Sequence, residues 1–291
     1  MTPEKMLLRA HRDHGCLVVR GPDAKSWLNG VVTCDVKALS EQRGTVGLLL
    51  TKQGKIQTDL LLLEGSGSIY LRVAPGLASN VHAELDRMLV MEDAELVDRS
   101  AELVFITLHG PQAVELGRAQ GALAFGEVDP TGHGGAALVI ERERLAALEQ
   151  GLRELGAGLD SGPEWLALRL DGAWPEFGVD YAQSDNPHEA SLDRRAIAWD
   201  KGCYLGQEVV CMQDMRGKLK RRVVGVELSG SELPPTGSEV RSAASGEVVG
   251  QVTSSGVAAR GGLRALAMVK APFFAPGQEL VLGNAAGRVL G

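Results

Sequence analysis

The sequence predicts an α+β fold that ends in a small all-β domain. Up to residue 222, strand-like and helix-like stretches alternate irregularly, with hairpins among them, which favours α+β over a doubly wound sheet. No Gly-x-Gly-x-x-Gly motif occurs, so a dinucleotide-binding fold has no support. After Lys220-Arg221-Arg222, short apolar runs separated by Pro and Gly replace this mixture, which predicts a small barrel.

The composition is that of an ordinary globular protein. The 291 residues are 44% hydrophobic and 23% charged, enough for two domains or three small lobes with real cores. A net charge of −7 argues against a nonspecific nucleic-acid binder, so we expect no direct nucleic-acid partner. No apolar run reaches membrane-spanning length and none follows Met1–Lys5 as in a leader, so we expect a cytoplasmic protein without a membrane partner.

The four cysteines, Cys16, Cys34, Cys203 and Cys211, form no Cys-x-x-Cys pair. Their spacing fits neither a disulfide scaffold, nor a zinc site, nor a self-contained iron–sulfur site, so we predict reduced thiols and no metal. Any iron–sulfur role would therefore act on the cluster of another protein. His11 and His14, three residues apart, are predicted to lie on the surface.

Individual elements follow from local patterns. Cys16–Val19 reads as a buried strand, and the next segment, up to Gly30, reads as a short helix. Two apolar runs, 45–50 and 56–63, are joined by Thr51–Lys55, which predicts a β-hairpin. Further strands are expected over 69–73, 104–108 and 136–140. Two helices are expected to be capped by Ser79 and Ser161. The strands of the barrel are expected over 223–228, 246–253, 263–269, 279–282 and 286–290.

The densest chemistry lies in the octet Lys201-Gly202-Cys203-Tyr204-Leu205-Gly206-Gln207-Glu208. Its two glycines permit a tight turn, and a helix is predicted to open at Gly206. A helix N-terminus and Lys201 would favour a thiolate at Cys203, whereas Glu208 would oppose it. The alternative is a buried structural cysteine in a tight turn.

This octet resembles the signature of the YgfZ-type folate-binding proteins, relatives of the aminomethyltransferase (T protein) of the glycine cleavage system. Arg169-Leu170-Asp171-Gly172 is similar to a T-protein motif, Arg-Leu-Glu-Ala, and Asn186–Leu192 resembles a family element, Pro-x-Glu-x-x-Leu. The resemblance implies two α/β lobes around a central cavity plus a C-terminal β-barrel. Its lobe boundaries would be 1–47 with 135–222 for lobe one, 48–134 for lobe two and 223–291 for the barrel.

The resemblance also implies a site for tetrahydrofolate or a folate derivative. One carboxylate accepts both the exocyclic amine and the ring N–H of a pterin, and Asp171 and Glu189 are the candidates. Either carboxylate alternatively serves a helix end or turn. Lys55, Tyr204, Gln207 and Glu208 are assigned to the same site, although Lys55 equally suits a solvated hairpin. Candidates for the anionic folate tail are Arg194, Arg195, Lys218, Lys220, Arg221 and Arg222.

By the same resemblance, the function would be a folate-binding accessory role in iron–sulfur cluster assembly or maintenance, supporting tRNA modification. Its partners would be folate and iron–sulfur client proteins, with Cys203 and Lys201 as the reactive pair. The alternatives are an aminomethyltransferase or related one-carbon transferase, and a docking module that has lost its ligand. The T protein carries an essential aspartate where this chain has Asn80 or Val81, which leaves enzymatic activity an open question.

Overall fold

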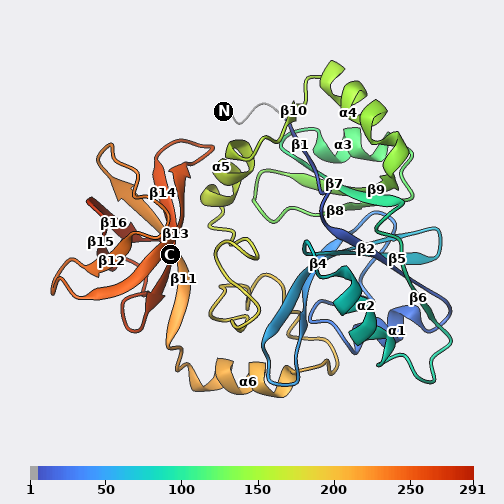
Figure 1. Ribbon diagram of the computed structural model, residues 1–291, viewed down its shortest axis with the longest axis horizontal. Helices are drawn as coiled ribbons and strands as arrows, with labels where there is room; N and C mark the ends of the chain where they lie inside the picture. Colours follow the sequence, from blue (N-terminus) through green and yellow to red (C-terminus); the bar gives the residue numbers. More distant parts are fainter. Residues whose placement is uncertain (1–5) are drawn as a thin grey trace. The chain divides into compact units, whose positions relative to one another are not determined.

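The computed structural model describes residues 6–291, which divide into two compact units. The N-terminal unit is the described part of Pro3–Ser161 together with Ala196–Gln207, and the C-terminal unit is Gly162–Arg195 together with Glu208–Gly291. Figure 1 shows both along the chain. The predicted lack of a leader and the start of predicted lobe one concern residues that lie outside the described part.

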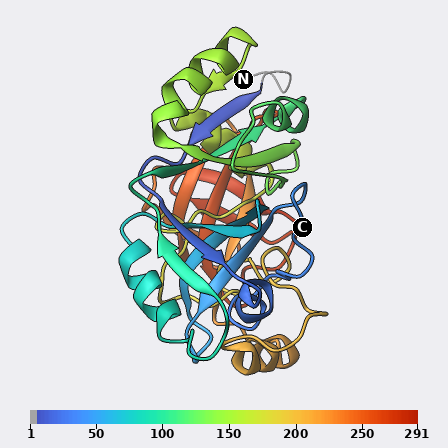
Figure 2. The ribbon, with the colours of Figure 1, turned by 90° about the vertical axis from the view of Figure 1, so that its right-hand side faces the viewer.

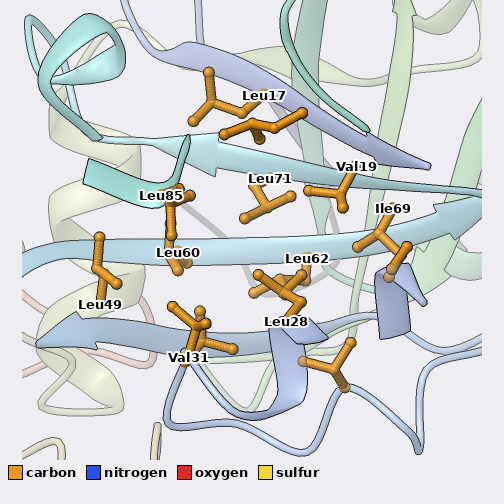
Figure 3. Close-up of a cluster of buried hydrophobic side chains, with 14 of the residues drawn as sticks. Leu17, Val19, Leu28, Val31, Leu49, Leu60, Leu62, Ile69, Leu71 and Leu85 are labelled. Carbon is orange, nitrogen blue, oxygen red and sulfur yellow. The ribbon is translucent and has the colours of Figure 1, made fainter. Parts of the chain in front are cut away.

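The first sheet of the N-terminal unit is antiparallel and has the strand order β3-β4-β5-β2-β6. Alternating leucines, isoleucines and valines of its strands meet the buried residues of two helices in one apolar core, which Figure 3 shows in close-up. Leu28 of one helix and Leu85 of the other lie in that core. The elements are β2 (Gly15–Arg20), α1 (Ala24–Asn29), β3 (Thr45–Leu50), β4 (Ile56–Gly65), β5 (Ser68–Val73), α2 (Ala78–Asp86) and β6 (Glu95–Asp98).

The second sheet of this unit has the strand order β10-β1-β7-β9-β8. Leu145, Leu148 and Leu152 follow helical spacing and pack on the sheet with residues such as Ile106 and Leu138. Figure 2 shows α3 and α4 beside these strands. The elements are β1 (Leu7–Ala10), β7 (Leu103–His109), α3 (Ala113–Arg118), β8 (Ala124–Glu127), β9 (Gly135–Glu141), η1 (Arg142–Arg144), α4 (Leu145–Glu154) and β10 (Gly158–Leu159).

The two sheets of the N-terminal unit share a further apolar cluster. It joins Leu61 and Leu63 of β4 to Phe105 of β7 and Val139 of β9. Because β-branched and aromatic side chains from both sheets interdigitate there, the two sheets form one folded body.

The C-terminal unit contains α5 (Pro163–Asp171), most of α6 (Gln207–Arg216) and a closed barrel of strand order β11-β14-β13-β12-β15-β16. Val226, Val240 and Val269 belong to the apolar core that fills the barrel. Outside it, Leu170 of α5 packs against Val223 and Leu266. The strands are β11 (Arg221–Ser229), β12 (Glu239–Ser242), β13 (Val248–Val257), β14 (Leu263–Lys270), β15 (Glu279–Leu282) and β16 (Ala285–Val289).

The predicted α+β class with a C-terminal barrel is therefore confirmed, while the lobe boundaries stay a prediction. Two predicted caps are wrong: the residues before α2 and α5 are Leu77 and Gly162, and neither helix has a side-chain cap. The surface position predicted for His11 and His14 is also wrong. His11 is 4% exposed, and the Thr107 hydroxyl lies 3.0 Å from its Nε2. His14 is half-buried, and its ring meets that of His11 edge-on.

Candidate functional site

Lys201 holds the octet onto the end of α1. Its Nζ donates hydrogen bonds to the carbonyls of Asn29 (2.6 Å), Val32 (2.6 Å) and Cys34 (2.7 Å). These carbonyls lie at and just beyond the C-terminus of the helix, where backbone acceptors lack helical partners and a cation interacts favourably with the helix dipole. An ammonium has three N–H donors, and here all three are used.

The Lys201 ammonium is isolated from counter-charges. In the part of the chain that the structure describes, it forms no ion pair, and the ring of Tyr204 lies 5.3 Å from Nζ. Burial lowers the pKa of Lys201 to about 8, although Cys34 and Asp35 act in the opposite direction. Lys201 therefore acts first as a clamp between the octet and α1.

Gly206 brings the octet against the β3–β4 hairpin. Its φ is +82°, and a Cβ at this position would stand 2.5 Å from the Thr51 carbonyl oxygen and 3.4 Å from the Cα of Gly54. Only glycine fits both that conformation and that distance. The next residue in the hairpin turn is Lys55, so the structure places Lys55 one residue from the contact with the octet.

Cys203 is the exposed cysteine of the four, which all lie in the described part. Cys16 and Cys34 are buried, and burial raises the pKa of each thiol to about 12. Cys211 is intermediate. At neutral pH a thiol reagent in solution therefore meets Cys203 before Cys16 or Cys34.

The helix predicted to open at Gly206 is confirmed, since α6 starts at Gln207. Gln207 and Glu208 form its first turn, and Glu208 is exposed. Tyr204 is 7% exposed and packs inside the N-terminal unit. A carboxylate in a first helical turn interacts favourably with the dipole, which gives Glu208 a local role beside its proposed folate role.

Asp171 is the last residue of α5. This agrees with the alternative given from the sequence, in which the carboxylate serves a helix end or turn. Its Oδ2 accepts the backbone N–H of Arg260 at 2.8 Å, and its Oδ1 lies 3.4 Å from NH1 of Arg264. The side chain is 1% exposed. A pterin contact at Asp171 stays a prediction, and the pterin would compete with these two partners.

Glu189 closes a turn in the segment 186–192. Its Oε2 accepts the backbone N–H of Asn186 at 3.1 Å, and the Asn186 Oδ1 accepts the backbone N–H of Glu189 at 2.9 Å. The other oxygen, Oε1, is 3.7 Å from Nε of Arg221. The Glu189 carbonyl accepts the N–H of Val223 at 2.7 Å, which fixes this turn to β11. Its predicted pterin contact likewise stays a prediction.

A buried ion network in the C-terminal unit was not foreseen from the sequence. Arg169 donates from NH1 to Asp180 Oδ2 (2.5 Å) and from NH2 to Ser254 Oγ (3.1 Å), and its Nε lies 3.2 Å from Glu176. Asp180 Oδ1 accepts the hydroxyls of Thr253 (2.6 Å) and Ser254 (2.7 Å). Arg169 and Asp180 are each 2% exposed, so the network ties α5 to β13 inside this unit. The Arg169-Leu170 pair in the motif was the available signal.

Three of the cations proposed for the folate tail are already paired. Arg221 donates to Asp185 (2.5 Å), Arg222 donates to Asp193 (2.8 Å), and Arg194 donates to Asp214 (2.8 Å). Asp193, Asp214 and His188 also have ligand atoms within 4.8 Å of one another. Because arginines already balance both aspartates, we assign no metal to this group.

A shallow hollow of about 570 Å³ lies elsewhere in the N-terminal unit. Pro111, Ala113, Arg118 and His133 are among its lining residues. None of the predicted site residues lines it, so the hollow and the candidate folate residues are separate features.

Comparisons with known proteins agree with this architecture. Residues 12–125 match the model of the GCVT N-terminal domain. A tRNA-modifying protein YgfZ from Photorhabdus laumondii is 27% identical over 241 residues, covering 78% of this chain and 73% of the relative. An aminomethyltransferase from Caldanaerobacter subterraneus is 25% identical over 268 residues, covering 82% and 70%.

Among solved structures, the glycine cleavage system aminomethyltransferase T from Bartonella henselae superposes with a TM-score of 0.81 at 19% identity. The match covers 99% of this chain and 85% of that one, and it shows a shared fold. The shared fold and the match of residues 12–125 to the GCVT N-terminal domain show that the chain is similar to the T protein. The chain is also similar to the tRNA-modifying proteins YgfZ, whose family signature the octet resembles.

No helix among residues 6–291 has the length and apolar character needed to cross a membrane.

Proposed function

We propose that the protein is a tetrahydrofolate-binding accessory protein that supports iron–sulfur cluster assembly or maintenance, and through it tRNA modification. The observation that carries this proposal is the octet itself. Cys203 is an exposed thiol in a loop that Lys201 clamps to α1 and Gly206 seats on the hairpin. A loop braced at both ends around an exposed thiol suits a reactive group better than a packing cysteine.

The folate part of the proposal rests on carboxylates. Glu189 and Asp171 would accept the amine and ring N–H of the pterin, and Lys55, Tyr204, Gln207 and Glu208 would complete the binding set. The relatives belong to a folate-binding family in general, which supports this assignment. The proposed lobe boundaries are those given by the resemblance. Iron–sulfur proteins would be the clients, and the cytoplasm the compartment.

The T-protein relatives make aminomethyl transfer the second candidate. At the positions aligned with the essential aspartate, Asn80 is exposed on α2 and Val81 is packed in the core. Neither side chain transfers a proton near neutral pH, so general acid–base chemistry lacks its group there. We therefore place the accessory role first. A glycine-cleavage assay with the lipoyl carrier separates the two, because turnover would establish the transferase.

The binding proposal is tested by titrating the protein with tetrahydrofolate and following tryptophan fluorescence. We expect saturable binding that Glu189→Gln and Asp171→Asn each weaken about tenfold, the effect of one lost charge-assisted hydrogen bond. Lys37→Gln, at an exposed residue outside the proposed binding set, is the control. No binding at high micromolar concentration would favour a module that has lost its ligand.

The role of Cys203 is tested separately in a cell that lacks its own copy of the protein. Cys203→Ala is expected to fold normally and to fail to restore the activity of an iron–sulfur client enzyme. Cys211→Ala, which removes a half-buried thiol eight residues along the chain, is the control. Full restoration by Cys203→Ala would make Cys203 structural.

A further inference from the structure

The segment Met215–Lys220 comprises the last two residues of α6 and the link from α6 to β11, which Figure 1 shows in orange. In the part of α6 and its continuation that the structure describes, only Val210 of the helix is buried. A ten-residue helix gains little stability by itself in water and usually relies on packing of one face. The exposed side chains of α6 are concentrated at its C-terminal end, where Met215 and Arg216 are followed by the exposed residues Gly217 and Lys218.

Three cations in this segment have no counter-ion. Arg216, Lys218 and Lys220 are exposed, and within residues 6–291 no carboxylate pairs with them. Asp214 of the same helix pairs with Arg194, and Asp185 and Asp193 pair with Arg221 and Arg222, which begin β11. The segment is thus a positively charged part of the surface on a protein whose net charge is −7.

The same segment exposes an apolar side chain. Met215 is 79% exposed and stands directly before Arg216. Methionine is flexible and polarisable, and it adapts to varied apolar surfaces. Gly217 changes the direction of the chain after the helix, with a φ of +60°. No atom lies within 4 Å of the position that a Cβ would occupy there, so the surroundings of Gly217 are open. Cationic and apolar groups therefore lie side by side with room for a ligand.

The mixture indicates the class of ligand. Single-stranded nucleic acid binds through basic grooves that contain aromatic stacking platforms. Residues 207–222 contain no aromatic side chain on which bases could stack. A protein segment that carries acidic and apolar side chains matches both features, because its carboxylates pair with the cations and its apolar groups cover Met215.

We propose that Met215, Arg216, Lys218 and Lys220 form a docking surface for an acidic, amphipathic segment of a partner protein. The inference deepens the accessory role proposed above by naming a surface for its client. It rests on that role only for the identity of the partner. The experiment below measures contact alone, so its failure would leave folate binding and the Cys203 test unaffected.

The probe is a fluorescein-labelled 20-residue peptide with Glu and Leu at helical spacing, whose binding to the full chain is followed by anisotropy. The triple variant Arg216→Glu/Lys218→Glu/Lys220→Glu is expected to weaken binding at least about tenfold, through three lost pairs and added repulsion. The matched control reverses three exposed, unpaired cations of the N-terminal unit, Lys37→Glu/Arg87→Glu/Arg153→Glu, and is expected to change binding less than about twofold.

Two further arms separate the proposed ligand from its alternatives. Met215→Ser is expected to weaken peptide binding about threefold, and a peptide with Gln in place of Glu is expected to bind at least about tenfold more weakly. The proposal is overturned if the triple variant and the control behave alike, or if Met215→Ser has no effect. It is also overturned if a 20-nucleotide single-stranded RNA binds the protein more tightly than the peptide does.

Discussion

The two units handle buried polar charge in opposite ways. The C-terminal unit keeps its charge and pairs it: the Arg169 guanidinium meets Asp180 and Glu176, and two hydroxyls complete the network. The N-terminal unit instead keeps buried imidazoles neutral and surrounds the Lys201 ammonium with backbone carbonyls. Burial lowers the pKa of His11 well below its ordinary value and that of His109 to about 3. Paired charge is sensitive to the loss of a partner, and neutralised charge is sensitive to pH.

The largest expected effect is the loss of one partner in the paired network. Asp180→Asn keeps the shape of the side chain but leaves the buried Arg169 charge with Glu176, which is partly exposed, as its remaining carboxylate partner. We expect the C-terminal unit to lose about 3–5 kcal/mol of unfolding free energy. Hydrogen exchange followed peptide by peptide, with denaturant, reports each unit separately. Glu176→Gln is the control, because its side chain is 27% exposed and it removes the same charge. Equal effects of the two variants would mean that burial does not govern the network.

Acid is expected to act on the other unit. The imidazoles of His11 and His109 are neutral when folded, whereas the unfolded chain takes up protons below about pH 6.5. The unfolded state then binds more protons, so stability is complete above pH 6.5 and is lost as the pH falls toward 3.

At pH 5 the loss should be about 2 kcal/mol for His109, and His11 should add to it in the same direction, with both effects confined to the N-terminal unit. The measurement is hydrogen exchange at pH 7.5 and pH 5, corrected for intrinsic rates. His109→Gln should reduce the difference by the contribution of one group. An equal loss in the C-terminal unit would contradict the contrast between the units.

A smaller effect is expected where Gly206 of the octet contacts the β3–β4 hairpin. Gly206→Ala places a methyl group against the Thr51 carbonyl at a positive φ, and we expect a cost of about 2–4 kcal/mol with partial loosening of the loop. Gly202→Ala is the matched control, because no atom lies within 4 Å of its built Cβ. Thermal denaturation and the alkylation rate of Cys203 are the measurements. Identical behaviour of the two alanine variants would show that the hairpin contact does not matter.

The smallest effect is expected at the clamp itself. Lys201→Met keeps the stem but leaves three carbonyls without their donor, which should cost about 1–2 kcal/mol because the site is only half-buried. Lys201→Arg should recover only part of this loss, since a planar guanidinium does not reproduce the three directions of an ammonium. Denaturant titration at pH 7 measures both variants. If Lys201→Arg kept the full unfolding free energy, the positive charge would be sufficient to hold α1, and the three directions of the ammonium N–H groups would not be needed.

Much of the fold was readable because local patterns agreed with the final structure. The 45–50 and 56–63 runs became β3 and β4, and five of the six barrel strands were located. Short strands such as β6 and β12 escaped because four residues carry too little periodicity. The chemistry of the octet was visible in the sequence, but its use of Lys201 was not, since the carbonyls it binds come from up to 172 residues away.

Arg169 and His11 illustrate the same limit. Each was visible as a polar residue, and an isolated polar residue is expected at the surface. Their burial depends on partners from distant segments, Ser254 for Arg169 and Thr107 for His11. Only the assembled fold brings such partners together, so sequence patterns fix the elements more readily than the polar contacts between them.

The strap formed by residues 196–207 has a consequence for synthesis of the chain. It completes a body whose two sheets are both made before residue 162, yet it emerges only after α5 has been made. Until then the Thr33 hydroxyl lacks the Ala196 carbonyl, and the end of α1 lacks its ammonium. During synthesis, the two sheets of the N-terminal unit therefore exist without residues 196–207 while about forty further residues are added. We expect a chaperone to bind the incomplete unit most readily in this interval.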